Sequence, residues 1–219
     1  MRTVTFATQK GGSGKSTLAI GLAVAAMQAG ERVFLLDTDR QGTVANWTTR
    51  RSNPEPGNEH VADGYGLDRS MRELARDGYT LAIIDTPGSN DSSTAAAIRA
   101  ADLCLIPARP SPADIEATHP TLLAIRRMDK EFAFVLNQTP VRSSRPSGAA
   151  AVLHELGVLA LPYIVQRNDH QDALGAGLAV SELAPNGKAA EEVRALWAWV
   201  KHKLDGESLD DGAAIAANG

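Results

Sequence analysis

The sequence predicts an α/β fold in which a doubly wound, mainly parallel sheet carries helices on both faces. Apolar runs alternate with stretches of helical character, which is the order expected of parallel strands joined by helical crossovers. The six runs lie at residues 3–7, 33–36, 81–84, 103–106, 132–136 and 158–164. Polar motifs follow the first three runs, and in a sheet of this kind a ligand binds at the carboxyl ends of the strands.

A glycine-rich loop follows the first apolar run. Residues 9–16 have the sequence QKGGSGKS, which fits the phosphate-binding pattern G-x-x-x-x-G-K-[ST] except at Gln9. Close-set glycines let backbone N–H groups turn inward around phosphate oxygens. Lys15 is expected to reach the β- and γ-phosphates, and the Ser16 hydroxyl to bind Mg²⁺. Residues 16–29 are predicted to form a helix whose positive end faces the phosphates, which gives a P-loop NTPase fold.

A second lysine, Lys10, stands at the entrance of this loop. The P-loop pattern requires Lys15 but has no place for a lysine here. Lys10 therefore suggests a cation that reaches a phosphate from outside, for example across a dimer. A glycine-rich turn without a ligand is the alternative. That alternative leaves unexplained why a strand, glycines, a lysine, a hydroxyl and a helix occur together in this order.

Carboxylates end the second and third apolar runs. Residues 33–36 lead into Asp37 and Asp39, which are two apart at a strand end and can point in different directions. One is expected to help hold Mg²⁺ or its waters, and the other to orient the attacking water. Residues 81–84 lead into Asp85, and an aspartate at this place in a P-loop protein commonly serves Mg²⁺. A solvated turn is the alternative for each segment.

The remaining sequence suits one domain. The chain has 219 residues, 43% of them hydrophobic, and we expect a single P-loop ATPase domain over residues 1–204. Residues 52–66 are rich in Pro, Gly, Asn and charge and predict a surface loop, and residues 205–219 predict a disordered tail. The single Cys104 is expected to be a buried thiol in a reducing compartment. No apolar run approaches the length of a membrane span, so no membrane insertion is expected.

The chain resembles the ParA/MinD family of deviant-Walker P-loop ATPases. The motifs that carry the resemblance lie at residues 9–17, 36–42 and 84–88, with weaker ones at 105–107, 110–114, 135–137, 177–182 and 188–192. Together they cover nearly the whole chain to about Leu204. The likeness is greatest to the small ParA-type partition ATPases that lack an N-terminal helix-turn-helix arm. Arg40 departs from the family pattern, which usually has proline there.

The resemblance implies a role for each motif residue. Lys10 would be the signature lysine that contacts the partner subunit's nucleotide in an ATP-bound sandwich dimer, and it would share catalysis with Lys15 and Asp39, which positions the water. The nucleotide phosphates would be held by Gly11, Gly12, Ser13, Gly14, Lys15, Ser16 and Thr17. The Mg²⁺ side of the site would be made by Ser16, Asp37 and Asp85. The adenine would be bordered by Pro107 and Asn137.

The resemblance also implies a function. Such proteins are weak ATPases that use ATP and Mg²⁺, and hydrolysis serves them as a timer. The ATP-bound homodimer would bind non-specific DNA, segregate or position plasmid or chromosomal DNA or another cargo, and be released when a ParB-like or other cargo-bound adaptor stimulates hydrolysis. It would be cytoplasmic and associated with a bacterial nucleoid. The net charge of −4 gives the monomer no overall attraction to DNA, so local basic clusters would have to supply it.

The basic residues that could do so form two groups in the sequence. The first is Arg109, Arg126, Arg127, Lys130, Arg142 and Arg145, and the second is Lys188, Arg194, Lys201, His202 and Lys203. Acidic residues are interspersed in both groups, so a solvated, charge-balanced surface is the alternative for each of these side chains.

Two other functions stay open. An amphipathic stripe runs along the C-terminal helix through Val193, Leu196, Trp197, Val200 and Leu204. A MinD-like regulator would lay such a helix on a membrane, whereas packing on the sheet is the simpler interpretation. The third possibility is a small-molecule ligase resembling dethiobiotin synthetase, which Lys10 and the paired Asp37 and Asp39 disfavour.

Overall fold

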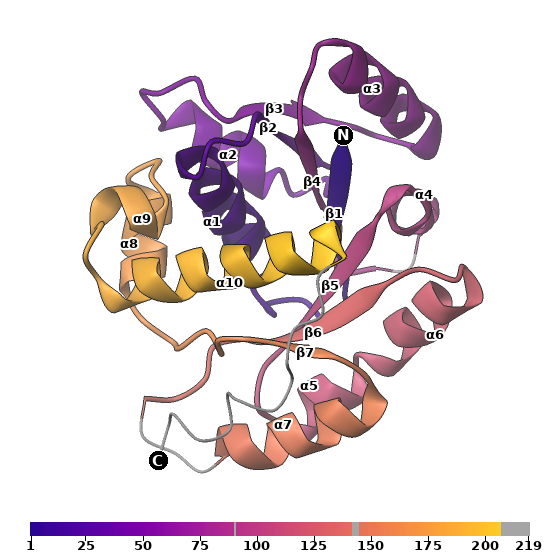
Figure 1. The fold of residues 1–219 in the computed structure, drawn as a ribbon, viewed down its shortest axis with the longest axis vertical. Coiled ribbons are helices and arrows are strands. Elements are labelled where there is room, and N and C mark those ends of the chain that lie inside the picture. Colours follow the sequence, from indigo (N-terminus) through magenta and orange to yellow (C-terminus); the bar gives the residue numbers. More distant parts are fainter. Residues whose placement is uncertain (90, 142–144, 207–219) are drawn as a thin grey trace.

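Seven strands pair in parallel in the computed structural model, which describes residues 1–89, 91–141 and 145–206. Their order across the sheet is β3-β2-β4-β1-β5-β6-β7 (Figure 1). The strands are β1 (Arg2–Phe6), β2 (Val33–Asp37), β3 (Gly57–His60), β4 (Leu81–Asp85), β5 (Leu103–Ala108), β6 (Phe132–Leu136) and β7 (Leu159–Ala160). Later strands add on both sides of β1, which confirms the predicted doubly wound sheet.

Helices connect the strands and close the chain. They are α1 (Lys15–Gln28), α2 (Thr43–Thr49), α3 (Gly64–Arg76), α4 (Ser92–Ala100), α5 (Pro112–Glu116), α6 (His119–Arg127), α7 (Arg145–Leu156), α8 (Asp169–Gly175), α9 (Val180–Leu183) and α10 (Lys188–Asp205). The helix predicted at residues 16–29 is α1, displaced by one residue at each end. Residues 207–219, the predicted tail, lie outside the described residues, so the domain boundary at residue 204 stays a prediction.

Alternate side chains of the strands pack on opposite faces of the sheet. On β5, Leu103 and Leu105 join the cluster that includes α1 and α10, whereas Cys104 and Ile106 join the cluster that includes α6 and α7. This is the period of two of a strand that is buried on both faces. Cys104 is fully buried, and burial raises the pKa of its thiol to about 12, so the predicted buried thiol is confirmed.

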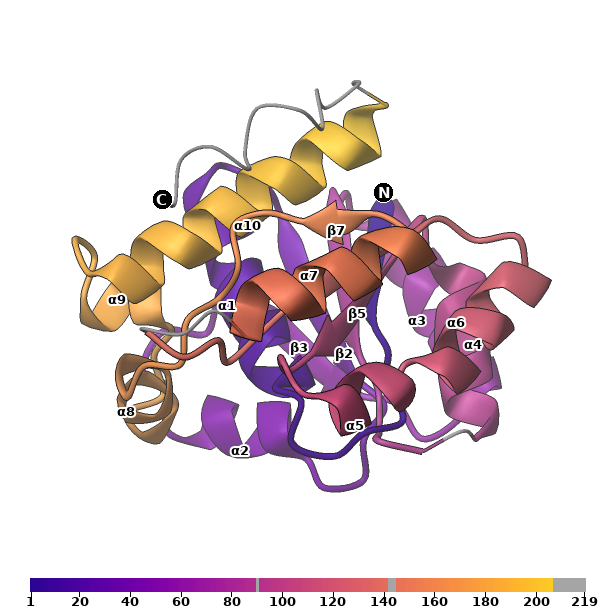
Figure 2. The same ribbon diagram turned by 90° about the horizontal axis from the view of Figure 1, so that it is seen from below.

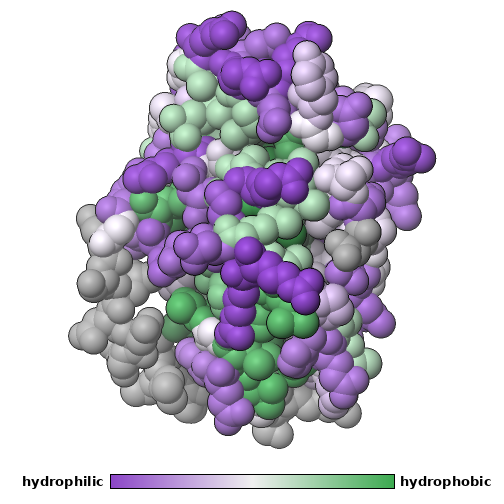
Figure 3. Space-filling model, turned by 90° about the vertical axis from the view of Figure 1, so that its right-hand side faces the viewer, coloured by the Kyte–Doolittle hydropathy of each residue, from purple (hydrophilic) through white to green (hydrophobic). Residues whose placement is uncertain are grey.

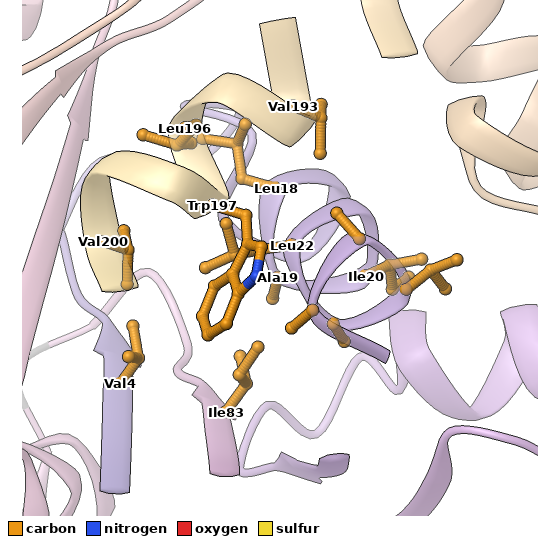
Figure 4. Close-up of a cluster of buried hydrophobic side chains, with 14 of the residues drawn as sticks. Val4, Leu18, Ala19, Ile20, Leu22, Ile83, Val193, Leu196, Trp197 and Val200 are labelled. Atoms are coloured by element: carbon orange, nitrogen blue, oxygen red, sulfur yellow. The ribbon is translucent and has the colours of Figure 1, made fainter. Parts of the chain in front are cut away.

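The amphipathic stripe of the C-terminal helix packs against α1. Figure 4 shows Val193, Leu196, Trp197 and Val200 of α10 turned toward Leu18 and its neighbours on α1, and all five side chains belong to one buried cluster. The packing interpretation of the stripe is therefore confirmed. In the part of the chain that the structure describes, every helix is too short or too polar to cross a membrane.

Two sequence predictions are wrong in extent. The predicted loop at residues 52–66 contains β3 and the start of α3. β3 is a polar edge strand, Gly-Asn-Glu-His, and an edge strand with no apolar face gives no alternation to detect. The apolar run at residues 158–164 forms a strand only at Leu159–Ala160, because Pro162 has no N–H to donate to a ladder.

The side of the molecule that carries α3, α4 and α6 has a more hydrophilic and a more hydrophobic region. In Figure 3, hydrophilic side chains cover its upper part and hydrophobic side chains gather in its lower part. Leu123 on α6 and Val152 on α7 are large hydrophobic side chains that remain exposed. Val152 also lines an apolar groove of about 450 Å³ between α5 and α7, together with Ile115 and Ala149. Exposed apolar patches of this kind commonly mark surfaces that meet another molecule.

Candidate nucleotide-binding site

A cavity of about 730 Å³ is lined by the loops that follow β1, β2 and β4. Figure 2 shows the indigo loop between β1 and α1 at the same edge of the molecule as α2 and α5. The predicted site residues that line the cavity are Gly11, Gly12, Gly14, Lys15, Ser16, Thr17 and Asp39. Motifs that are far apart in the sequence therefore meet where a parallel sheet binds its ligand.

The amino terminus of α1 is built to face an anion. Gly14 is its N-cap residue, with a left-handed φ of 90°, and no side chain caps this helix end. No acidic residue lies in the first turn. The first N–H groups of a helix have no partner within the helix, and the helix dipole adds positive potential there. Phosphate oxygens would accept hydrogen bonds from these N–H groups, and the positive potential would stabilise their negative charge.

Lys15 is the buried cation of the loop. Its ammonium donates hydrogen bonds to the carbonyl oxygens of Thr8 at 3.1 Å and Lys10 at 3.4 Å. Burial lowers the pKa of Lys15, and the negative charges of Asp85 and Asp39 oppose this. Since its present partners include only neutral oxygens, the ammonium gains a stronger, charge-assisted bond when a phosphate enters the cavity.

Two amide side chains after β6 hold the P-loop in place. The Nδ2 atom of Asn137 donates to the carbonyl oxygen of Ser13 at 2.8 Å, and the Nε2 atom of Gln138 donates to that of Gly12 at 3.1 Å. A Cβ atom on Gly14 would lie 2.4 Å from Asn137 Nδ2. Glycine at this position thus allows the amides to approach the loop.

Asp37 holds the acidic loop that follows β2. Its Oδ1 atom accepts a hydrogen bond from the Asp39 N–H at 2.9 Å, and its Oδ2 atom accepts one from the Val44 N–H at 3.2 Å. Burial raises the pKa of Asp37, and these backbone hydrogen bonds oppose the rise. Asp39 is only half-buried and lines the cavity. The two carboxylates therefore hold different positions, one beneath the loop and one at the cavity.

Asp85 is a buried carboxylate without hydrogen-bond partners. It ends β4 in register with Asp37 on β2, and among the described residues no donor bonds to either of its oxygens. Burial, together with the charge of Asp37, raises the pKa of Asp85 to about 7, while the nearby Ser16 hydroxyl and the Lys15 charge oppose the rise. Such a carboxylate fits Mg²⁺ or its waters, because they supply the charge and the donors that it lacks.

Comparison with known proteins decides the kind of site. Residues 4–180 match the model of the CobQ/CobB/MinD/ParA nucleotide binding domain. The chain belongs to this family. The cavity at the strand ends is accordingly a nucleotide site, and the predicted ParA/MinD resemblance is confirmed.

Two relatives within the CobQ/CobB/MinD/ParA family have names that describe positioning or partition. Maintenance of carboxysome distribution protein A from Gloeobacter kilaueensis is 34% identical over 209 residues, which cover 93% of this chain and 94% of the relative. Chromosome-partitioning ATPase Soj from Thermus thermophilus is 32% identical over 135 residues, which cover 49% of this chain and 54% of the relative.

Two solved structures share the fold of the family. An ATP complex of a Cyanothece McdA variant has a TM-score of 0.70 and 19% identity, and the match covers 95% of this chain and 98% of that one. Cobyrinic acid a,c-diamide synthase from Mycobacterium smegmatis, with an ATP analogue and magnesium, has a TM-score of 0.74, 17% identity and the same coverage. Likenesses at this identity show the fold alone. The family match shows a nucleotide-binding domain, and the ligands of these two structures, ATP in one and an ATP analogue with magnesium in the other, agree with the predicted ATP and Mg²⁺.

Removing the Asp85 carboxylate is expected to flatten the pH dependence of folding stability in the nucleotide-free protein. The raised pKa means that the folded state binds a proton more tightly than the unfolded state, whose Asp pKa is about 3.9. The stability that protonation gives is fully present below about pH 4 and is lost as the pH rises to about 7. The Asp85→Asn variant keeps the shape of the side chain but has no proton to lose.

The measurement is the thermal midpoint between pH 5 and pH 8 in a buffer with a chelator. The wild-type midpoint should fall with pH more steeply than that of Asp85→Asn. Asp68→Asn, a change on the exposed face of α3, is the matched control and should follow the wild type. Parallel curves for all three proteins would remove Asp85 from the groups that titrate in this range.

The predicted site residues that do not line the cavity of this family member are Lys10, Ser13, Asp37, Asp85, Pro107 and Asn137. Pro107 lies inside β5, paired with Val135 of β6, so its contact with adenine stays a prediction, as does that of Asn137. Lys10 is half-buried and is not among the residues that line the cavity. Burial would raise the pKa of Asp114 on α5, but hydrogen bonds from Ser111 and Arg109 and the charges of Arg109 and Lys10 hold it low.

Part of the cavity wall was not predicted from the sequence. Ser89, Asp91, Ser92 and Ser93 line it where α4 begins, and Asp91 caps α4 by accepting a hydrogen bond from the Thr94 N–H at 2.9 Å. The sequence Ser-Asn-Asp-Ser-Ser has the composition of a helix start, which was the available signal. Arg40, the departure from the family pattern, is exposed at the rim of the cavity.

Proposed function

We propose that this protein is an ATP-driven switch of ParA type, which dimerises on ATP, binds non-specific DNA and positions a cargo along it. The observation that carries this proposal is the separation of the two P-loop lysines. Lys15 lines its own nucleotide cavity, whereas Lys10, in the same loop, is not among the residues that line it. A lysine outside its own cavity is available to the nucleotide of a second subunit, so hydrolysis would depend on dimer formation.

The catalytic groups suit slow hydrolysis. Asp39 at the cavity would orient the attacking water, and Lys10 and Lys15 would stabilise charge on the phosphates. Phosphoryl transfer is catalysed mainly by such positioning and charge stabilisation. If one of these charges comes from a partner, the isolated subunit turns over slowly and an adaptor that promotes the closed dimer stimulates it.

The relatives favour a large cargo. The 34% identity to a carboxysome-distribution protein extends over 93% of this chain, and supports a protein assembly as the cargo. The match to the chromosome-partitioning ATPase covers 49% of the chain and supports DNA as the alternative cargo. In either case we propose a cargo-bound adaptor that stimulates hydrolysis, and a location on the bacterial nucleoid.

Many of the basic side chains from the two predicted clusters are engaged within the subunit. Arg109 pairs with Asp114, and Lys203 pairs with Glu131. Arg142 lies outside the described residues. Since affinity for DNA grows with the number of phosphates neutralised, a single subunit would bind weakly and the combined face of two subunits more strongly. This supports DNA binding that depends on ATP.

The other two functions have less support. The apolar stripe of α10 is packed against α1, so a MinD-like membrane helix would have to come from elsewhere. A metabolic ligase cannot be separated by fold, since the cobyrinic acid synthase structure is as similar as the McdA structure. The placement of Lys10 is what favours the switch.

The test is DNA binding by Asp39→Ala, which is expected to bind ATP without hydrolysing it. Binding to random-sequence duplex should occur with Mg-ATP, be absent with Mg-ADP, and fall by at least about tenfold between 50 and 200 mM salt. Asp68→Ala, a change away from the cavity, is the control and should hydrolyse ATP like the wild type. A clear ATP dimer that binds no DNA would refute the DNA track, and binding to anionic vesicles instead would favour the MinD-like function.

A further inference from the structure

A buried ion pair joins the segment after α2 to α9. The Nη1 and Nη2 atoms of Arg51 donate to the two carboxylate oxygens of Glu182, each at 2.7 Å. The side chain of Arg51 is 1% exposed and that of Glu182 is 17% exposed. Burial would raise the pKa of Glu182, but the hydrogen bonds from Arg51 and the Ala179 N–H hold it below its usual range. The pair is therefore charged and two-pronged, the geometry in which arginine fixes a direction as well as a distance.

The other groups around Arg51 are also fixed. Its Nε atom donates to the Glu55 carbonyl at 2.7 Å, and Nη1 also donates to the Gly177 carbonyl at 3.1 Å. The guanidinium lies 4.6 Å from the ring centre of Trp47, the fully buried aromatic of α2. These contacts and the ion pair together compensate the positive charge of Arg51. Removing the charge of either Arg51 or Glu182 would leave the other charge buried and unpaired.

The backbones on the two sides of the pair are in direct contact. Gly177 has a φ of 70°, and a Cβ atom there would lie 2.4 Å from the carbonyl oxygen of Arg50. The indole N–H of Trp47 donates to the Leu178 carbonyl at 3.1 Å. This contact accounts for the motif at residues 177–182: glycine allows the close approach, and Glu182 receives the arginine.

The opposite end of α2 reaches the nucleotide site. The Val44 N–H in its first turn donates to Asp37, which also accepts from the Asp39 N–H. Thr43 and Asp39 line the cavity. The N-cap residue of α2 is Gly42, in a left-handed conformation, so it supplies no side-chain cap of its own, and the Asp37 carboxylate is the acceptor for the first turn. The position of α2 therefore depends on Asp37 and the buried Val44 at one end, and on the contacts of Trp47, Arg50 and Arg51 at the other.

We propose that the Arg51–Glu182 pair is a clamp that sets the position of Asp39 through α2, which makes Arg51 a positioning residue for ATP hydrolysis. The proposal rests on the ATPase function proposed above. Arg51 touches no part of the nucleotide cavity. Loosening the clamp lets α2 and the loop at residues 38–43 move, while the P-loop, held by Asn137 and Gln138, stays in place. Hydrolysis then falls and ATP binding does not.

The first test measures the clamp without using hydrolysis. Glu182→Gln keeps the volume of the side chain and one carbonyl acceptor for Arg51 but removes the charge. Tm should fall, because the buried Arg51 charge loses its partner, and circular dichroism should show that the variant is folded at the temperature of the measurement. Hydrogen exchange with mass spectrometry should show amides of residues 38–49 exchanging at least about tenfold faster than in the wild type, with residues 9–17 and β5 unchanged. Glu73→Gln, which breaks the exposed Arg69–Glu73 pair on α3, is the matched control and should leave residues 38–49 unchanged. Unchanged exchange over residues 38–49 in Glu182→Gln would overturn the clamp.

The second test asks whether the clamp serves catalysis. Glu182→Gln should keep a Kd for ATP within about threefold of the wild type and lose at least about tenfold in kcat, whereas a structural role alone would lower Tm without this split. Arg51→Lys keeps the positive charge but loses the two-pronged contact. Its kcat should therefore fall less than that of Glu182→Gln. Faster exchange with an unchanged kcat would overturn the positioning role. If the wild type hydrolysed no ATP, the proposed function would fail, and the exchange measurement alone would decide whether the clamp holds this segment.

Discussion

Replacing Lys15 with alanine is expected to weaken ATP binding by at least about 100-fold and leave the fold intact. Each hydrogen bond between a charged group and its partner contributes roughly 1.5–3 kcal/mol, and about 2.7 kcal/mol corresponds to 100-fold in Kd. Lys15 is expected to contact two phosphates from inside the cavity. Folding should tolerate the change, because Lys15 is a partly desolvated cation that donates hydrogen bonds to the backbone carbonyls of Thr8 and Lys10.

The measurement is the Kd of a fluorescent ATP analogue, with circular dichroism and Tm recorded on the same samples. Lys188→Ala, which removes an exposed lysine at the start of α10, is the matched control and should bind as the wild type does. An affinity of Lys15→Ala within about threefold of the wild type would contradict the P-loop assignment. A lower Tm in Lys15→Ala would point to a folding effect instead. Circular dichroism spectra recorded without nucleotide would reveal it.

Local patterns in the sequence were enough to predict the centre of the site. Each polar motif of the site follows an apolar run: the loop at residues 9–16 follows the first, Asp37 and Asp39 the second, and Asp85 the third. Parallel strands bring such ends to one edge of the sheet. The pattern also predicted the buried stripe of α10, since an apolar face at helical spacing on a soluble fold usually packs inward. In these cases the information lies within one segment.

What the sequence did not reveal depends on contacts between distant segments. Arg51 and Glu182 are 131 residues apart, and nothing in either neighbourhood indicates a bidentate pair. The resemblance predicts that Asn137 borders the adenine, which stays a prediction, but no local pattern indicates that its amide also holds the P-loop at Ser13, across 124 residues. β3 went unpredicted for a related reason, since its polar residues form a strand only because β2 offers a free edge.

Replacing Lys10 with alanine is expected to keep ATP binding within about threefold and to lower hydrolysis by at least about tenfold, an effect typical of removing a charge that acts in the transition state. The reason is its position. Lys10 does not line its own cavity, and its backbone carbonyl, which an alanine retains, is one of the two carbonyl oxygens that hold Lys15. The measurement is kcat together with the Kd for ATP. A variant with full turnover in the presence of the adaptor would exclude any role for this lysine in hydrolysis.

Mixing two inactive variants can show whether Lys10 acts in its own subunit or in the partner. A Lys10→Ala subunit binds ATP and retains Asp39, whereas an Asp39→Ala subunit binds ATP and retains Lys10. If the lysine crosses, each mixed dimer has one complete site, and an equimolar mixture should recover about a quarter of the wild-type rate because about half of randomly paired symmetric dimers are mixed. If the lysine acts within its own subunit, no complete site exists in any dimer, and the mixture should stay at the sum of its two inactive components. Hydrolysis that appears only on mixing would therefore place the lysine of one subunit at the nucleotide of the other.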